Sequence, residues 1–412
     1  MIMSALTWGL ALSGLALAIP ALYLLILTVA ALRHPGRRQI DGVFHGLREA
    51  RQRFIILIPA HNEELLLGTV VQQLDKLSYP RSHFEIVVIA DNCDDRTAAV
   101  ARAADAEVLE RHDLSQRGKG HALDWALRGA LAQWARPYDA VVVLDADSVV
   151  NADFLWFMQA RLETGAEALQ SYYGVLNPLE NWRTSLSLAA LAAFHFLRPL
   201  GRDRLGLPCG LKGNGMCFTK RLVLTYGYPA FSVVEDVELA IFLLRKGVGV
   251  RFVPGAQVFG QMTTSAHAAS VQRARWEGGR WALIRRLSGP LLREGFRTRD
   301  AAMLDAAVDL LVPPFTILTG ISGLAAISGL LLAALHTAPL TVGVASGLAA
   351  VLAVEMVYVW VALALVRAPA KIYGRLIFAP LFVVWKLGVY LRLAMGRGGA
   401  AVWTRTERQR LS

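Results

Sequence analysis

The feature that most constrains this chain is the stretch Ser4–Leu32, which carries no charged residue over about 29 positions. A backbone in lipid must satisfy its own hydrogen bonds, and about 20 apolar residues suffice to cross the hydrocarbon core as a helix. A secretory signal peptide is the competing interpretation, but it favours a basic start and a shorter apolar run. We therefore predict a transmembrane helix within residues 1–35.

Further apolar stretches lie near the end of the chain. Leu310–Leu335 and Leu340–Val366 predict two more spans. A third stretch, Leu376–Leu393, is interrupted by Lys386 and Arg392 and is either a span or an interfacial segment. Together they predict a C-terminal membrane region with two or three segments over residues 306–395.

The charge distribution suggests an orientation for these segments. The formal net charge is +11, and arginines crowd the region after Leu32, whereas no charge precedes Ser4. Positive residues favour the cytoplasmic side. We expect the N-terminus outside and the polar part of the chain in the cytoplasm, at a cytoplasmic (inner) membrane. We attribute the basic balance to membrane lipids and expect no nucleic-acid partner.

The polar part alternates strand-like and helix-like patterns. The clearest strands are Phe54–Ala60, Phe84–Asp91 and the run that starts at Ala140, with helical patterns between them. Such alternation indicates a mostly parallel α/β sheet. We predict one α/β domain over residues 51–255, inserted between transmembrane helices.

The run Ala140–Val150, "AVVVLDADSVV", ends its apolar part in two carboxylates, Asp145 and Asp147. Ligands of open α/β sheets bind at the carboxyl ends of strands, and alternation along a strand would put both residues on one side. Mg²⁺ or Mn²⁺ prefers oxygen ligands and commonly binds one or two carboxylates plus substrate phosphates. The pattern predicts a metal–diphosphate site. The competing interpretation is a pair of surface residues that caps the next helix.

Other strand ends carry further candidates. The first strand ends "IPAHNEE", where Pro59 and Glu63 are candidates for contact with a base or ribose. The second ends at Asp91, a candidate ligand, and "GKG" places Lys119 at a helix start where it would meet phosphate.

Candidates for the acceptor side come later in the sequence. "LPCGLKGNGMCF" includes Gly213 and is either a flexible turn or a loop that an acceptor approaches closely. Glu235 and Asp236 precede a helical pattern, as caps or as a general base.

The motif "QRARW" lies in a region rich in Arg and Trp, which we assign to interfacial helices over residues 256–305. On a helix, Gln272 and Trp276 are i and i+4, with Arg275 beside them. Arg suits a diphosphate and Trp suits a sugar, although an interfacial helix alone would explain the composition.

In this order, these motifs resemble the membrane-integrated family 2 glycosyltransferases, which include cellulose, hyaluronan, chitooligosaccharide and poly-N-acetylglucosamine synthases. The resemblance covers about Phe54–Trp281. It implies a GT-A fold and inverting, metal-dependent transfer from a UDP-sugar. It also implies a role for each candidate: Asp91 at uracil, Lys119 near the base and diphosphate, Asp145 at ribose and metal, Asp147 on the metal, Asp236 as base, and Gln272, Arg275 and Trp276 at the diphosphate and acceptor.

Three functions follow as alternatives. The first is transfer of one hexose or N-acetylhexosamine to a lipid, lipid-linked or polysaccharide acceptor, which the small number of predicted helices favours. The second is a processive polysaccharide synthase that also translocates its polymer, with possible export or polymerisation partners. The third is a non-catalytic membrane partner that binds nucleotide sugars, which would have no use for Asp236.

Overall fold

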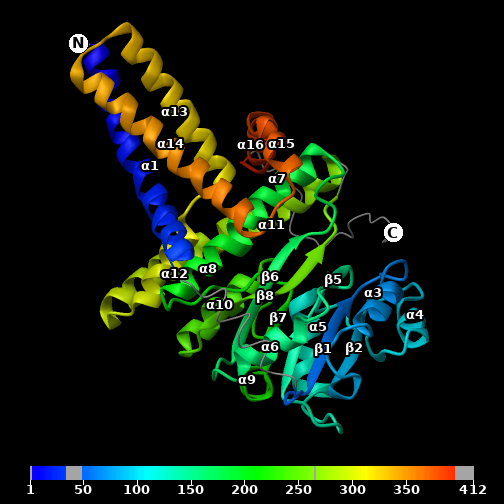
Figure 1. The fold of residues 1–412 in the computed structure, drawn as a ribbon. Coiled ribbons are helices and arrows are strands. Elements are labelled where there is room, and N and C mark those ends of the chain that lie inside the picture. Colours follow the sequence, from blue (N-terminus) through cyan, green and yellow to red (C-terminus); the bar gives the residue numbers. More distant parts are fainter. Residues whose placement is uncertain (1, 34–48, 264–265, 395–412) are drawn as a thin grey trace.

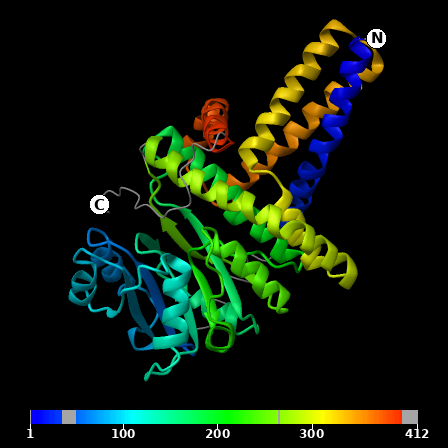
Figure 2. The same cartoon turned by 180° about the vertical axis from the view of Figure 1, so that it is seen from behind.

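The computed structural model describes residues 2–33, 49–263 and 266–394, with side chains described outside 264–277 and 389–394. An α/β domain carries an arm of long helices, which projects away from it (Figures 1 and 2). The chain enters through the arm, forms the domain and then returns to the arm. This order agrees with the predicted insertion of an α/β domain between apolar helices.

The domain is built on one eight-stranded sheet with the order β3-β2-β1-β4-β7-β6-β8-β5. Strands β3, β2, β1 and β4 are parallel, β7 is antiparallel to β4 and β6, β6 and β8 are parallel, and β5 is antiparallel to β8. The predicted α/β sheet is therefore confirmed, with a parallel half and a mixed half. The strands are β1 Phe54–Ala60, β2 Phe84–Asp91, β3 Glu107–Arg111, β4 Ala140–Val143, β5 Ser148–Val150, β6 Ala168–Val175, β7 Met216–Thr219 and β8 Val250–Gly260. Strand β8 thus runs past the predicted domain boundary at residue 255.

The helices follow the expected alternation in the first half of the domain. They are α1 Ile2–Arg33, α3 Leu67–Leu74, α4 Thr97–Ala103, α5 Lys119–Trp125, α6 Phe154–Leu162, α7 Trp182–Leu191, α8 Arg198–Arg204, α9 Lys220–Tyr226, α10 Glu235–Arg245, α11 Ala266–Thr298, α12 Ala301–Leu311, α13 Phe315–Leu335, α14 Pro339–Leu365, α15 Ala370–Arg375 and α16 Ala379–Ala394. Short π-helices follow α5 (η2, Ala126–Ala130) and α7 (η3, Ala192–Leu197), and 3-10 turns are η1 Arg81–His83 and η4 Leu376–Phe378.

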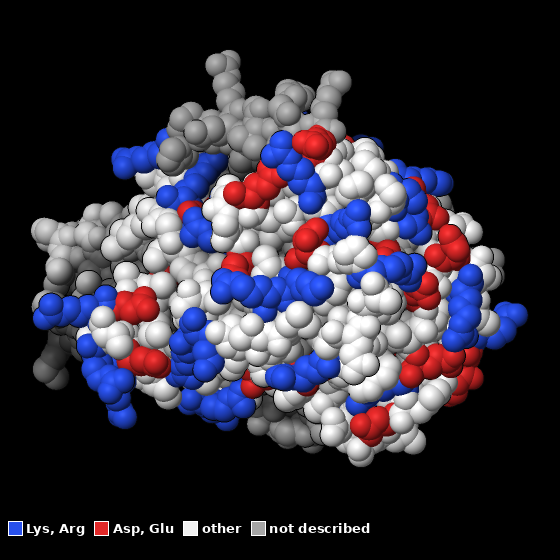
Figure 3. Space-filling view, turned by 90° about the horizontal axis from the view of Figure 1, so that it is seen from below, with Lys and Arg blue, Asp and Glu red and all other residues white. Residues whose placement is uncertain are grey.

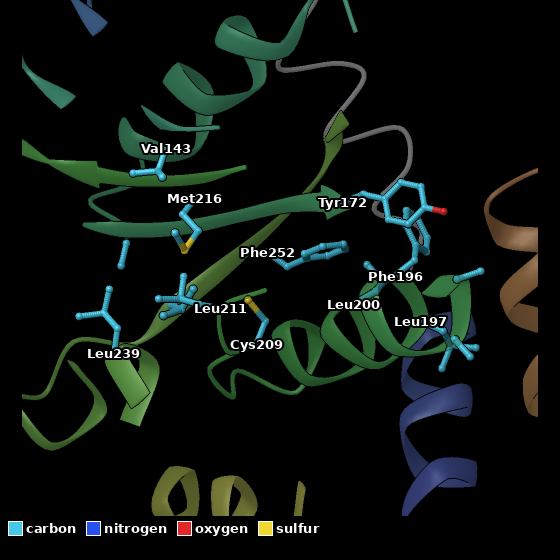
Figure 4. Close-up of a cluster of buried hydrophobic side chains, with 14 of the residues drawn as sticks. Val143, Tyr172, Phe196, Leu197, Leu200, Cys209, Leu211, Met216, Leu239 and Phe252 are labelled. Atoms are coloured by element: carbon cyan, nitrogen blue, oxygen red, sulfur yellow. The ribbon is translucent and has the colours of Figure 1, made fainter. Parts of the chain in front are cut away.

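Strand β1 shows why the sheet strands are continuously apolar. Its residues alternate between two cores: Phe54, Ile56 and Ile58 pack with α3 and α6, whereas Ile55 and Leu57 pack with α5 on the other face. Both faces are covered, so neither needs polar residues. The second core continues to η3 and α8, where side chains from several strands point toward the helices (Figure 4).

Among the described residues, three helices are long and apolar enough to cross a membrane: α1, α13 and α14. They lie side by side as the arm (Figure 1). The predicted start at Leu310 is wrong because Pro313 and Pro314 separate α12 from α13. Helix α16 lies beside α7, α11 and α13, and both alternatives for Leu376–Leu393, a span or an interfacial segment, stay predictions.

The face of the domain turned away from the arm mixes Lys and Arg with Asp and Glu (Figure 3). Ion pairs at the surface of the described residues include Arg136 with Glu85 and Glu107. Exposed pairs of this kind contribute little to stability. This face therefore carries no single-signed patch among its described residues.

Helices α1 and α8 cross at Gly201, where a Cβ atom would lie 2.4 Å from the carbonyl oxygen of Leu27. We expect Gly201→Ala to force the helices apart and to lower stability by about 1–3 kcal/mol. At Gly343 of α14 a Cβ would meet nothing within 4 Å, so Gly343→Ala is the matched control. Thermal unfolding of the full chain in detergent measures both. Equal midpoints for the two variants would contradict the close crossing.

Candidate active site

The predicted site residues Pro59, Asp91 and Asp145 lie where parallel strands β1, β2 and β4 end at the same edge of the sheet. The expected mechanism of their alignment is wrong in one respect. Strand β4 ends at Val143, so Asp145 and Asp147 do not alternate along a strand but lie in the loop that leads to β5. The physical reason is that the side chain of Asn214 binds this loop at both ends.

Asn214 holds the Asp145–Asp147 loop in place. Its Oδ1 accepts a hydrogen bond from the backbone N–H of Asp145 (3.1 Å), and its Nδ2 donates to Ser148 Oγ (2.7 Å). Asn214 is fully buried, and Asp147 is only 5% exposed. The loop is fixed at both ends, so its carboxylates are positioned rather than solvated at random.

Lys119 connects this loop to the opposite wall of the site. Its Nζ donates to Asp145 Oδ1 and to the carbonyl oxygen of Gly213, both at 2.5 Å. Burial alone would lower the pKa of the Lys119 ammonium, but the carboxylates of Asp145, Glu235 and Asp236 raise it. Lys119 is therefore a charged group surrounded by acids from three segments of the chain.

The glycine-rich loop is fixed rather than flexible. Gly213 has φ +78° and Gly215 has φ +67°, a backbone region that favours glycine. A Cβ at Gly215 would lie 1.9 Å from Ser171 Oγ, and one at Gly213 would lie 3.6 Å from Asp236 Oδ2. The loop thus places Gly213 between Lys119 and Asp236.

Glu235 and Asp236 form the first turn of α10, where the helix dipole favours acidic residues. Burial raises the pKa of Glu235 to about 7, and the neighbouring Asp236 carboxylate adds to the rise while Lys119 opposes it. Burial also raises the pKa of Asp236. The two carboxylates share one environment and titrate together.

The second strand ends in a buried ion pair. Asp91 Oδ1 accepts a hydrogen bond from Arg111 Nη1 at 2.6 Å, and Asp91 and Arg111 lie opposite one another in the β2–β3 register. His61 Nδ1 contacts the carbonyl oxygen of Asp91 at 2.7 Å. Two neighbours therefore orient Asp91: Arg111 binds its carboxylate and His61 contacts its backbone carbonyl.

Pro59 and Glu63 flank the end of β1. Glu63 is 7% exposed, and its backbone N–H donates to Thr97 Oγ1 (2.8 Å). Asp95 Oδ1 accepts from the Thr97 backbone N–H (2.8 Å), although the N-cap residue of α4 is Arg96, whose side chain makes no capping hydrogen bond. These bonds tie the end of β1 to the start of α4.

Gln272, Arg275 and Trp276 belong to α11, but their side chains lie outside the described residues. The helix itself is placed by Gly279, where a Cβ would meet Val234 Cγ1 at 3.0 Å. Val234 immediately precedes Glu235, so α11 passes beside the start of α10. The side-chain roles of the three residues remain predictions.

Several residues of this site escaped sequence reasoning. Arg111 lies on β3, a strand that the sequence did not clearly predict, and only the strand register places it opposite Asp91. Asn214 stands between two glycines, in a motif that gave no hint of its clamp. In the "GKG" motif, a Cβ at Gly120 would lie 2.0 Å from the carbonyl oxygen of Ala230, so a glycine is needed there for close packing.

The raised pKa of Glu235 has a consequence for stability. A carboxyl whose pKa is higher in the folded state contributes stability below its unfolded pKa near 4.5 and loses it as pH rises through about 7. We expect the unfolding midpoint of Glu235→Gln to fall less than that of the wild type between pH 5 and pH 8.

Glu238 on the same helix is the control, because hydrogen bonds from Ser232 and Arg286 outweigh its burial and lower its pKa. Glu238→Gln is expected to lower stability by a nearly constant amount between pH 5 and pH 8, because a carboxyl whose pKa is lowered below 4.5 is charged in both the folded and the unfolded state over that range. Thermal unfolding scans of the three proteins measure this, and a Glu235→Gln profile that runs parallel to that of the wild type would contradict the assignment.

Comparisons with known proteins follow this geometry. A model of the family described as "Glycosyltransferase like family 2" matches residues 51–279, more than half of the chain. Over 235 residues the chain is 30% identical to the beta-monoglucosyldiacylglycerol synthase of Trichormus variabilis, covering 54% of this chain and 48% of that protein. Over 245 residues it is 22% identical to the poly-beta-1,6-N-acetyl-D-glucosamine synthase of Staphylococcus aureus, covering 56% and 55%. The chain spans about half the length of the curated relatives it matches.

Two solved structures share parts of this shape. The mannosyltransferase PcManGT from Pyrobaculum calidifontis, solved with GDP-Man and Mn²⁺, has a TM-score of 0.44 and 17% identity, covering 84% of this chain and 98% of that one. The glucosyl-3-phosphoglycerate synthase of Mycobacterium tuberculosis, solved with Mn²⁺, UDP and phosphoglyceric acid, has a TM-score of 0.37 and 20% identity, covering 59% and 81%.

Proposed function

The chain belongs to glycosyltransferase-like family 2, and from that premise we propose that it transfers a hexose or N-acetylhexosamine from a UDP-sugar to an acceptor at the cytoplasmic face of the membrane. The acceptor is a lipid, a lipid-linked saccharide or a polysaccharide, and the configuration at the anomeric carbon is inverted. One observation carries the proposal: Lys119 joins Asp145 to Gly213, and Gly213 lies against Asp236. A site for the donor phosphates and a candidate base are thus adjacent.

On the donor side, the proposal assigns the base and ribose to the ends of β1 and β2. Pro59, Glu63 and Asp91 line those strand ends, and Arg111 fixes the Asp91 carboxylate. Lys119 then neutralises charge on the diphosphate from its place at the start of α5. Gln272, Arg275 and Trp276 are proposed to hold the diphosphate and the acceptor end.

A divalent cation fits the chemistry of the loop after β4. Among the described residues, no group of three or more metal-binding side chains occurs. Mg²⁺ and Mn²⁺ need only one or two carboxylates when phosphates and water supply the other ligands. Asp147 and the second oxygen of Asp145 would hold the ion, which supplies charge neutralisation for the leaving diphosphate.

On the acceptor side, Asp236 is the proposed general base and Glu235 its neighbour. A carboxylate with a raised pKa is a better proton acceptor near neutral pH. Asp236 would take the proton of the attacking hydroxyl while the bond between the anomeric carbon and UDP breaks. The arm supports addition of a single sugar to a lipid, because a polymer channel needs more helices than the three candidate spans described.

The assignment of the base predicts a selective loss. Asp236→Asn is expected to lower sugar transfer by about 10²–10⁴-fold and to leave UDP binding within about twofold, because only the proton acceptor is removed. UDP release from a panel of UDP-sugars and UDP binding to the purified chain measure the two effects. Asp75→Asn, which removes only a surface pair with Arg81, is the matched control and should change neither. Undiminished turnover by Asp236→Asn would refute the base.

The metal assignment predicts a second dependence. Removal of divalent ions by a chelator is expected to stop UDP release, and added Mg²⁺ or Mn²⁺ is expected to restore it. In Asp147→Asn the concentration of metal needed for half-maximal rate should rise about tenfold or more, because a buried ligand loses its charge. A titration identical to that of the wild type would contradict the role of Asp147.

A further inference from the structure

A second set of charged residues lies on the side of Asp236 that faces the arm, around the ring of Phe194 in η3. Lys212 Nζ lies 3.9 Å from the ring centroid, Arg198 Cζ lies 5.0 Å from it and Arg280 Cζ lies 5.8 Å from it. An aromatic ring attracts each cation, but three cations at one ring also repel one another. We call Phe194, Arg198, Lys212 and Arg280 the cation cluster.

The carboxylates beside the cation cluster are already engaged by arginines. Arg198 Nη1 lies 3.1 Å from Asp309 Oδ1, and Arg202 lies 2.6 Å from Asp305 Oδ2 and 3.2 Å from Asp309 Oδ2. Among the described side chains (residues 2–33, 49–263 and 278–388), that of Lys212 makes no ion pair within 4.0 Å and no hydrogen bond. Lys212 is thus left without a direct anionic partner among the described side chains, and the Asp236 carboxylate acts on it only from beyond ion-pair distance.

The environment of Lys212 destabilises its charge. Burial and the guanidinium groups of Arg198 and Arg202 lower the pKa of the Lys212 ammonium to about 8, against the opposing effect of Asp309 and Asp236. A bound anion would reverse that effect, since opposite charges favour the charged form. The lack of a direct anionic partner and the lowered pKa of Lys212 therefore both favour a bound anion beside its ammonium group.

The position of the cation cluster indicates where such an anion comes from. Lys212 is the neighbour of Gly213, which lies against Asp236. Behind the cluster, Tyr358 of α14 donates to the carbonyl oxygen of Ala193 (2.6 Å). The cation cluster thus lies between Asp236, the candidate general base, and the end of the apolar arm that meets the domain. If the arm spans a bilayer, this is the level of the lipid headgroups.

We propose that the cation cluster binds the phosphate group of a lipid acceptor, so that the acceptor is an anionic phospholipid rather than a neutral lipid such as diacylglycerol. This inference rests on the proposed function and names its acceptor class. The phosphate is the anchor, and a hydroxyl of the same headgroup is the nucleophile. That hydroxyl bonds to the anomeric carbon, its proton passes to Asp236 and UDP leaves. We expect Lys212 to contribute most to the affinity for the phosphate, because the guanidinium of Arg198 already contacts Asp309.

The test measures binding to the full chain purified in dodecyl maltoside at pH 7. The probes are dodecyl phosphate, dodecyl glycerol with the same chain and a neutral head, inorganic phosphate, and UDP. We expect Lys212→Met to weaken dodecyl phosphate binding at least tenfold and to leave dodecyl glycerol and UDP binding within about twofold. Lys212→Arg keeps the charge and should stay within about threefold of the wild type.

Lys220→Met is the matched control, because Lys220 Nζ also lies over an aromatic ring, 4.5 Å from the centroid of Tyr138, but outside the site. It should bind all four probes like the wild type. If Lys212→Met does not fold, Phe194→Leu carries the same comparison. Unchanged dodecyl phosphate binding by the folded variant, or equal wild-type affinity for dodecyl glycerol, would overturn the inference.

Two further outcomes separate the possible sources of the phosphate. Inorganic phosphate that binds as tightly as dodecyl phosphate would overturn the lipid part, and an equal loss of UDP binding in Lys212→Met would place Lys212 in the donor site instead. Hydrolysis of UDP-sugars in the absence of acceptor is followed in parallel. If the wild type neither binds nor hydrolyses any UDP-sugar, the proposed function fails, whereas the phosphate comparison still reports on the cluster.

Discussion

The structure depends on a buried ion-pair network that joins the arm to the α/β domain. Arg198 and Arg202 of α8 bind Asp305 and Asp309 of α12, and Tyr23 of α1 donates to Asp305 Oδ1 at 3.0 Å. Desolvation offsets much of the attraction in a buried pair, whereas removal of one partner leaves an unpaired charge at large cost. The network therefore specifies which helix surfaces meet more than it adds to stability. With α8 held in this way, η3 and the glycine-rich loop are held as well.

The position of the candidate active site depends on the same packing of helices and sheet. Parallel strands β1, β2 and β4 bring their carboxyl ends to one edge, and the fixed loop with Gly213 closes the site from the other half of the sheet. Because Lys119 bridges these halves, the carboxylates of Asp145 and Asp236 share one buried environment. The ammonium of Lys119 thus faces three carboxylates, those of Asp145, Glu235 and Asp236. Burial keeps the pKa of Glu235 and Asp236 raised, although Lys119 opposes the rise.

Sequence reasoning succeeded where the signal was local. Strands Phe54–Ala60 and Phe84–Asp91 have the predicted bounds, since a strand buried on both faces is a short unbroken apolar run. Sequence reasoning failed where two segments that are distant in the chain meet. Strand alternation was expected to align Asp145 with Asp147, but Asn214, 69 residues beyond Asp145, fixes their loop.

The sequence alone determined that this chain has apolar helices around an α/β domain, which residue types lie at its strand ends and which family it resembles. These follow from composition, period and motif order, which are properties of neighbours along the chain. Only the tertiary structure decided that Arg111 binds Asp91, that Lys119 meets Gly213, and that Lys212, Arg198 and Arg280 surround Phe194. The physical reason is that burial and charge balance arise from residues far apart in sequence, so no local pattern records them.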